Sequence, residues 1–172
     1  MFSRDLGPAA LYADDVLLAP NKDIHLTVEN QRVKQADSQF GTSAKGYIYT
    51  GSEVKMIANL SEVALATLGI IVPGSTIIAD EFMLSNPTGD QARDSAVKLE
   101  ARLYVDNIVS TDPLDFITLF VAVPDIKLDL GFDGENERMY QVEFEALPVT
   151  SVPSGETYAI GAKCAIAYGE TT

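Results

Sequence analysis

Few side chains in this sequence have the types and spacing that chemistry needs. The chain has one histidine, His25, and one cysteine, Cys164. A single histidine excludes a histidine-rich metal site. Any Ser-His-Asp set would have to use His25, yet no serine lies in a Gly-x-Ser-x-Gly elbow. His25 alternates with apolar residues, which is typical of the solvent face of a strand. Cys164 lies in an apolar alternation and is interpreted as a small core residue rather than a nucleophile.

Two stretches begin like ligand-binding loops but fail the full pattern. Gly41 and Gly46 have the spacing of a phosphate loop, but Tyr47 stands where the lysine of such a loop follows. Residues 129–134 begin like a calcium loop, but the twelfth position, where a glutamate is needed, is Tyr140. The sequence therefore predicts no metal and no other cofactor.

Glu143 and Glu145 are the remaining candidates for catalysis. They lie two residues apart on one face of a predicted strand, so they could form a carboxylate pair for acid–base chemistry. Solvated carboxylates on a strand are the commoner arrangement. With no nucleophile or cofactor motif beside them, we interpret both as solvent-exposed charges and expect a protein that is not an enzyme.

Composition indicates one folded domain over residues 1–172. Hydrophobic residues make up 47% of the chain, and 25 acidic against 12 basic residues give a net charge of −13. Affinity for phosphates depends on Lys and Arg, so a surface that grips nucleic acid is not expected. The single cysteine forbids an internal disulfide, which is compatible with a reducing cytoplasm. No signal peptide and no apolar run of ~20 residues is present, so no membrane contact is expected.

The rest of the chain is organised around a long predicted strand over residues 45–58. The alternation places two sets of side chains on opposite faces: Ile48, Val54, Met56 and Ala58 on the buried face, and Tyr47, Tyr49, Glu53 and Lys55 on the other. Strands are typically ~5–6 residues long, and one this long usually reaches a neighbouring subunit.

A short helix is predicted directly after this strand. Asn59 is a good N-cap, and Glu62 three residues later completes a capping box. Leu60, Val63 and Leu68 lie on one helical stripe, and Gly69 is a natural C-terminal stop.

The segment before the long strand, residues 29–44, is predicted to be a long inter-strand loop. Its apolar alternation fails, and a plain hairpin needs only two to five loop residues. Such a connection is either disordered or reaches a partner. Val33 and Phe40 give it something to bury, which favours a partner; the candidate contact residues are Val33, Gln35, Asp37 and Phe40.

Several further strands are predicted by alternation. A hairpin or bent strand surrounds Asp14-Asp15, and regular strands are expected over residues 96–106, 126–132, 140–146 and 158–166. Residues 115–123 are apolar on both faces and predict a central strand; a helix capped by Asp112 with Pro113 in its first turn is the alternative. About eight strands with one short flanking helix predict a mainly β fold, either a β-sandwich or a partly closed barrel.

The order of these elements resembles the major tail tube protein of long-tailed, siphovirus-like bacteriophages. The matching segments, which span most of the chain, are GPAALYADDV, FGTSAKG, TGSEVKMIA, NLSEVALATLG, AVKLEARLYV and FVAVPDIKLDLGFDGENERMYQVEFEALPV. The match is weakest over residues 71–95, and no single motif is diagnostic.

The resemblance implies a structural virion protein with the phage tail tube fold. Six subunits form a ring, their inner strands join into one β-barrel, and the rings stack into the hollow tail tube through which the genome is delivered into the host. Residues 29–44 match the loop that joins one ring to the next. The implied partners are other copies of the chain, the tape measure protein, the tail terminator and the distal tail protein. The implied location is the virion tail, assembled in the host bacterial cytoplasm.

In such a tube, DNA is only a transiting cargo, and an acidic bore would repel it weakly and offer it no place to bind. Two polar strand faces are candidates for the bore: Glu53 with Lys55, and Glu143 with Glu145. Two alternatives stay open. One is a tube subunit of a contractile injection or secretion machine, and the other is a soluble β-sandwich enzyme or binding domain.

Overall fold

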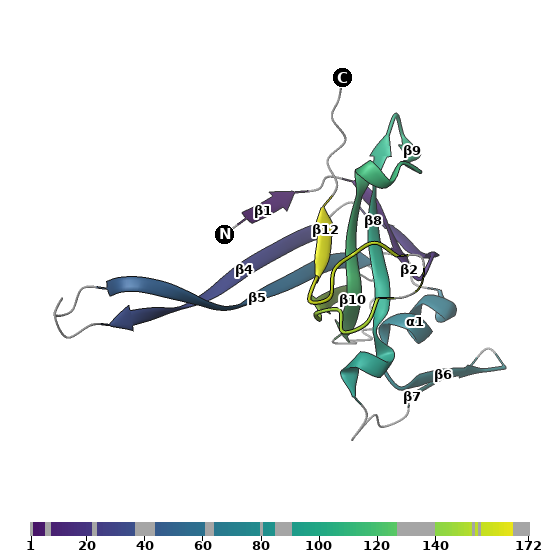
Figure 1. The fold of residues 1–172 in the computed structure, drawn as a ribbon. Helices are drawn as coiled ribbons and strands as arrows, with labels where there is room; N and C mark the ends of the chain where they lie inside the picture. Colours follow the sequence, from purple (N-terminus) through teal and green to yellow (C-terminus); the bar gives the residue numbers. More distant parts are fainter. Residues whose placement is uncertain are drawn as a thin grey trace, which may run out of the picture.

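The chain forms one large antiparallel sheet that curls around its own core (Figure 1). This computed structural model describes residues 2–5, 8–21, 24–36, 44–60, 64–79, 81–84, 91–126, 140–152, 154 and 156–166. The strands are β1 (Phe2–Asp5), β2 (Ala9–Ala13), β3 (Val16–Asn21), β4 (Ile24–Ala36), β5 (Ala44–Leu60), β6 (Ser75–Ile78), β7 (Glu81–Leu84), β8 (Val97–Val105), β9 (Ile108–Val109), β10 (Phe116–Ile126), β11 (Tyr140–Ala146) and β12 (Cys164–Ile166). The helices are α1 (Leu65–Ile71) and two short 3₁₀ turns, η2 (Ala92–Ser95) and η3 (Pro113–Asp115).

The sheet confirms the predicted mainly β, sandwich-like class. Its strands follow the order β1-β4-β5-β11-β10-β8-β2-β3, with β9 and β12 attached to β8 and β10. The sheet is not closed into a barrel, because β1 and β3 remain at its two ends. β6 and β7 form a separate hairpin that packs beside α1 (Figure 1).

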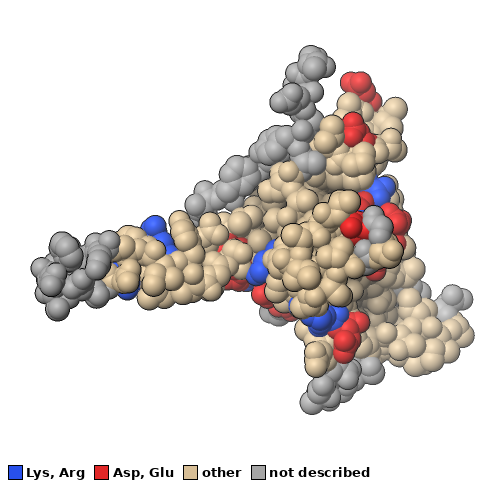
Figure 2. All heavy atoms as spheres, in the orientation of Figure 1, with Lys and Arg blue, Asp and Glu red and all other residues tan. Residues whose placement is uncertain are grey.

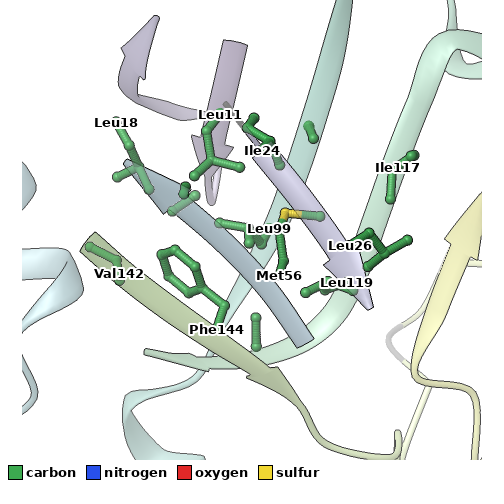
Figure 3. Close-up of a cluster of buried hydrophobic side chains, with 14 of the residues drawn as sticks. Leu11, Leu18, Ile24, Leu26, Met56, Leu99, Ile117, Leu119, Val142 and Phe144 are labelled. Carbon is green, nitrogen blue, oxygen red and sulfur yellow. The ribbon is translucent and has the colours of Figure 1, made fainter. Parts of the chain in front are cut away.

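The core lies between the two halves of the curled sheet. Figure 3 shows Leu11 and Leu18 from β2 and β3 reaching toward Met56 of β5 and Phe144 of β11. The predicted buried faces are confirmed in this core, where these residues are at most 2% exposed: Leu99 of β8, Val54, Met56 and Ala58 of β5, and Val142 and Phe144 of β11. Val105, predicted on the same face as Leu99, is instead 49% exposed, because β8 has left the core at that point. Burial of this apolar surface is the main stabilisation of the fold.

β10 is the central strand that the sequence predicts, and the signals that favoured a helix have a separate role. β10 pairs with β11 and β12 on one side and with β8 on the other. Asp112 does cap a helical turn, since its carboxylate accepts a hydrogen bond from the Leu114 N–H at 2.9 Å. That turn is only η3, and the β-branched residues after it continue as strand.

The β2–β3 hairpin is also confirmed. Asp14 and Asp15 occupy its turn with φ of 46° and 65°, a left-handed geometry that Asp tolerates better than most residues. The carboxylate of Asp14 accepts a hydrogen bond from the Lys98 N–H at 2.9 Å, and that of Asp15 lies 3.0 Å from the Arg102 guanidinium. Arg102 also pairs with Glu100, so this turn is fixed to β8 from two sides.

The prediction of a helix capped by Asn59 is wrong. Asn59 lies within β5, opposite Gln141 of β11, and α1 begins six residues later with Ala64 at its N-cap position and no side-chain cap. Pairing with β11 satisfies the backbone around Asn59 more fully than a helical turn would, so β5 continues to Leu60. Glu62, the other half of the predicted capping box, lies outside the described residues.

Gly69 is not the stop of α1 but lies inside it. A Cβ atom built there would stand 3.0 Å from the Cδ1 of Ile77 in β6. The glycine therefore allows the β6–β7 hairpin to approach the helix closely.

The last predicted strand is shorter than expected. Only Cys164–Ile166 forms a strand, and residues 156–163 follow an irregular path over β10. Gly161 adopts a φ of 87°, and its N–H donates to the Val149 carbonyl at 2.8 Å. This left-handed turn breaks the extended geometry that the alternation predicts.

Two adjacent leucines of β3 test the position of the core. Leu18 is 3% exposed and Leu17 is 46% exposed. Leu18→Ala should lower the free energy of unfolding by ~2–5 kcal/mol, because it removes buried surface and leaves a cavity. Leu17→Ala should lower it by about 1 kcal/mol or less. Urea unfolding of both variants measures the difference, and equal losses would contradict this orientation of β3.

Candidate functional site

The candidate site is the long hairpin formed by β4 and β5. The loop predicted over residues 29–44 is largely strand, since β4 runs to Ala36 and β5 begins at Ala44. The cross-strand pairing, which includes Val33 with Ile48 and Gln35 with Gly46, satisfies the backbone that the polar sequence predicted to be loop. Two of the candidate contact residues, Asp37 and Phe40, lie outside the described residues.

The far part of this hairpin projects away from the body (Figure 1). We name residues 29–36 and 44–53 the distal hairpin. β1 pairs with β4 only as far as Val28, and β11 pairs with β5 only as far as Lys55. In the described part of the chain, the distal hairpin therefore has no third strand, so neither outer edge is paired with another strand, although the Lys163 ammonium donates a hydrogen bond to the Ser52 carbonyl. Open edges of this length are ready templates for pairing with another chain.

A β-bulge at Thr50 exchanges the faces of β5 halfway along the distal hairpin. Gln31 is opposite Gly51, but the next residue, Arg32, is opposite Tyr49, so Thr50 is an extra residue in β5. Beyond the bulge, odd-numbered residues of β5 share the face that even-numbered residues occupy before it. Ile48 therefore does not share a face with Val54, and the predicted alternation is wrong beyond this point; Ile48 is 55% exposed.

The first face of the distal hairpin continues the core-facing side of β4 and β5 and is aromatic and cationic. We name Arg32, Lys34, Tyr47 and Tyr49 the aromatic face. The cross-strand pairs are Arg32 with Tyr49 and Lys34 with Tyr47. The guanidinium of Arg32 lies 4.7 Å from the centroid of the Tyr47 ring, a cation–π contact. Tyr47 and Tyr49 are 56% and 71% exposed, so both rings present most of their surface to solvent.

The second face carries the carboxylates. The two polar faces that the sequence predicted separately, Glu53 with Lys55 and Glu143 with Glu145, lie side by side on it. Lys55 is opposite Glu145 in the β5–β11 pair, and Glu143 is the next residue of β11 on the same side. The Nζ of Lys55 lies 2.8 Å from Glu53 and 2.9 Å from Glu143. Glu29, opposite Glu53, adds a fifth charge that the sequence analysis assigned to a loop. We name Glu29, Glu53, Lys55, Glu143 and Glu145 the carboxylate face.

The electrostatics of the carboxylate face follow from Lys55 and the acids around it. The Lys55 ammonium donates hydrogen bonds to Glu53 and Glu143, which raise the pKa of Lys55. The hydrogen bond from Lys55 lowers the pKa of Glu53, and the charge of Lys163 lowers it further. Both groups therefore stay charged at neutral pH, and the face keeps an excess of negative charge. Because the side chains are largely in solvent, the pairing adds little to stability.

The residues first considered for chemistry are not gathered into a reactive site. His25 is an exposed residue of β4, and Cys164 is half-buried in β12 against the core. Burial raises the pKa of the Cys164 thiol, which disfavours the reactive thiolate. Within the described residues, no three His, Cys, Asp or Glu side chains come together as metal ligands. No helix in the same part of the chain is long and apolar enough to cross a membrane.

The fold and site define a class: a mainly β, sandwich-like protein that presents a long hairpin with two chemically different faces. No protein-family model matches the sequence, and none of the curated proteins compared with it matches. One sequence signal for the bulge is present in retrospect. A glycine inside a strand pattern often marks a bulge, and Gly51 follows Thr50 directly.

The ion pairs of Lys55 give a test by titration. In Lys55→Gln, the pKa of Glu53 should rise, because its hydrogen bond and its nearest positive charge are both lost. The stabilisation in the native protein is present above the unfolded carboxyl pKa of ~4.3 and is lost as the pH falls through the lowered folded value. Carboxyl carbon shifts in an NMR titration measure the change. Arg93→Gln, remote from this face, should leave the titration of Glu53 unaltered; an unaltered Glu53 in Lys55→Gln would contradict the pairing.

Proposed function

We propose that this chain is the subunit of a self-assembling protein tube, the major tail tube protein of a long-tailed bacteriophage. The observation that carries the proposal is the distal hairpin with both edges open. A two-stranded ribbon is only marginally stable by itself in water. Pairing of the β4 edge of one copy with the β5 edge of the next supplies the missing strands on both sides. Repeated around a ring, this pairing closes a barrel and removes the open edges of the distal hairpins.

The geometry of the pairing favours a ring over a simple dimer. The two edges of the distal hairpin are different surfaces, so contacts between copies run head to tail. Contacts of this kind form closed rings when the rotation between copies closes, and filaments otherwise. A hexameric ring that stacks into a tube has both a closed ring and a filament of rings. In this proposal the end of the hairpin supplies the contact between successive rings. The tape measure protein, the tail terminator and the distal tail protein are the further partners that a virion tail requires.

The carboxylate face supports a conduit for DNA. It lies on the solvent side of β5 and β11, opposite the core, and continues along the distal hairpin to Glu29. In a closed barrel this side becomes the bore. Lys55 is held between Glu53 and Glu143, and Lys163, whose charge also lowers the pKa of Glu53, donates a hydrogen bond to the Ser52 carbonyl. Neither lysine therefore offers passing phosphates an isolated cation. The chain therefore acts as a structural wall that repels DNA rather than as an enzyme.

Removal of the distal hairpin tests the assembly. Replacing residues 32–50 with Asn-Gly joins Gln31 to its partner Gly51 by a two-residue turn. The variant should fold, with a urea midpoint close to that of the full chain, because none of the removed residues that the structure describes belongs to the core cluster. It should form no rings or tubes in negative-stain electron microscopy, whereas the full chain should form them. Tubes from the shortened chain would overturn the proposal.

Charge reversal on the carboxylate face tests the bore. Glu29→Lys with Glu145→Lys should leave tubes that retain duplex DNA, with an affinity that falls steeply between about 50 and 200 mM salt. Co-sedimentation of DNA with assembled tubes measures the retention. Glu81→Lys with Asp94→Lys makes the same charge change away from this face and should retain no DNA. Equal behaviour of the two double variants would exclude the carboxylate face from the bore.

A further inference from the structure

A second exposed surface lies at the end of the β8–β9 hairpin, which we name the acidic tip (residues 105–115). Val105, Ile108 and Leu114 are 49%, 72% and 53% exposed. Asp106 and Asp112 are exposed beside them, and the sequence has no Lys or Arg from Leu103 to Ile126. Figure 2 shows this end of the molecule, at the upper right, in red and tan without blue. Apolar and acidic side chains therefore share one surface.

The acidic tip is held in shape by its own hydrogen bonds. Asp106 and Asn107 form its turn with φ of 51° and 63°. The Ser110 N–H donates to the Leu103 carbonyl at 2.9 Å, and the Ser110 hydroxyl donates to Asp115 at 2.6 Å. A surface that is ordered before binding loses little conformational entropy when a partner docks.

The aromatic face of the distal hairpin has the complementary chemistry. Its two cations would meet the carboxylates of Asp106 and Asp112, and its two tyrosines would cover exposed aliphatic side chains of the tip. Tyrosine and arginine are the residues that most often dominate the energy of protein interfaces. Among the described residues of the distal hairpin, both acids, Glu29 and Glu53, lie on the opposite face. An acidic partner therefore fits the aromatic face, in a chain whose net charge is −13.

The two surfaces cannot meet within one molecule. In Figure 1 the distal hairpin ends at the far left, whereas the β8–β9 hairpin stands at the upper right of the body. Contact between them requires a second copy of the chain. The contact is again head to tail, so each copy uses its hairpin on one neighbour and its tip on another.

We propose that the aromatic face of one copy binds the acidic tip of another copy. This inference rests on the proposed self-assembly and adds a contact to it. Edge pairing joins the hairpins to each other, while the aromatic face, turned away from the carboxylate face, docks on the body of a further copy. Such a contact combines apolar burial with charge pairing, so it weakens as salt rises.

Nucleic acid is the rival occupant of the aromatic face, since tyrosines and an arginine can stack on unpaired bases. Two cations in a strongly acidic chain make it the weaker candidate, because phosphate affinity scales with the number of cations engaged. Displacement of the protein–protein contact by a single-stranded oligonucleotide would favour this rival and count against the proposal.

The test uses two charge-reversed variants of the full chain. The hairpin variant is Arg32→Glu with Lys34→Glu, and the tip variant is Asp106→Lys with Asp112→Lys. Each alone should sediment as smaller species than the native chain at about 50 mM salt, because each opposes like charges across the contact. Mixed together, they should associate again, because the reversed hairpin meets the reversed tip. Circular dichroism establishes that both variants fold. If the tip variant does not fold, Asp106→Asn, which keeps the left-handed turn, replaces it; this change should by itself weaken association with the native hairpin, and native-like assembly of Asp106→Asn would then overturn the proposal.

Matched controls separate this contact from general charge effects. Arg32→Gln and Gln31→Glu alter the net charge equally at adjacent positions on opposite faces, and only Arg32→Gln should weaken association. Glu81→Lys with Asp94→Lys makes the same charge change as the tip variant at positions outside the acidic tip, and it should leave association unaltered.

Recovery of association when the hairpin and tip variants are mixed supports the proposal. Native-like assembly of either variant alone would overturn it while leaving the tube in place. Association through these surfaces without rings or tubes would overturn the proposed function instead, and a native chain that stays monomeric would overturn both.

Discussion

The pairing of β4 with β5 is the interaction on which both the body and the candidate site depend. Near Ile24 and Ala58 this pairing lies inside the core, where apolar side chains from both strands are buried. The same ladder then continues past Val28 and Val54 into a region where the core has ended. Hydrophobic burial supports the first half, whereas the described residues of the second half are supported by cross-strand contacts and by the hydrogen bond from Lys163 to the Ser52 carbonyl. A fold that extends its longest ladder beyond its own core leaves an incomplete sheet, and completion by another chain is the physical argument for assembly.

The sequence predicted the body of the fold well because there the local pattern and the tertiary packing agree. In β8 and β11 the alternating residues face one core and nothing interrupts the period, so the buried faces follow directly. The same holds for the turn at Asp14 and Asp15, where residue type and backbone geometry coincide. Where local sequence preference and tertiary packing favour the same structure, the structure can be predicted from the sequence.

The predictions failed where a distant strand decided the outcome. Asn59 is a residue type that favours a helix N-cap, but in the fold its backbone pairs with β11. This pairing depends on a strand about 80 residues away, so no local sequence pattern predicts it. The polar residues of β4 beyond Val28 looked like a loop because a ribbon with two solvated faces has no apolar alternation. The bulge at Thr50 is harder still, since a single inserted residue reverses the faces without changing the composition.

The bulge at Thr50 determines which side chains share each face of the distal hairpin. Without the extra residue, Tyr47 and Tyr49 would lie with Glu53, and Ile48 would extend the core side. With it, the tyrosines lie with Arg32 and Lys34, and the opposite face keeps the carboxylates. The charges are thereby separated across the ribbon, with carboxylates on one face and tyrosines and cations on the other. In the proposed assembly, a ribbon without a core would gain both edge bonds and buried surface from its neighbours, so its own stability and the association of copies would form one equilibrium. Such coupling would favour complete assemblies over partial ones, because a copy at an open end would lack the contacts that stabilise its hairpin.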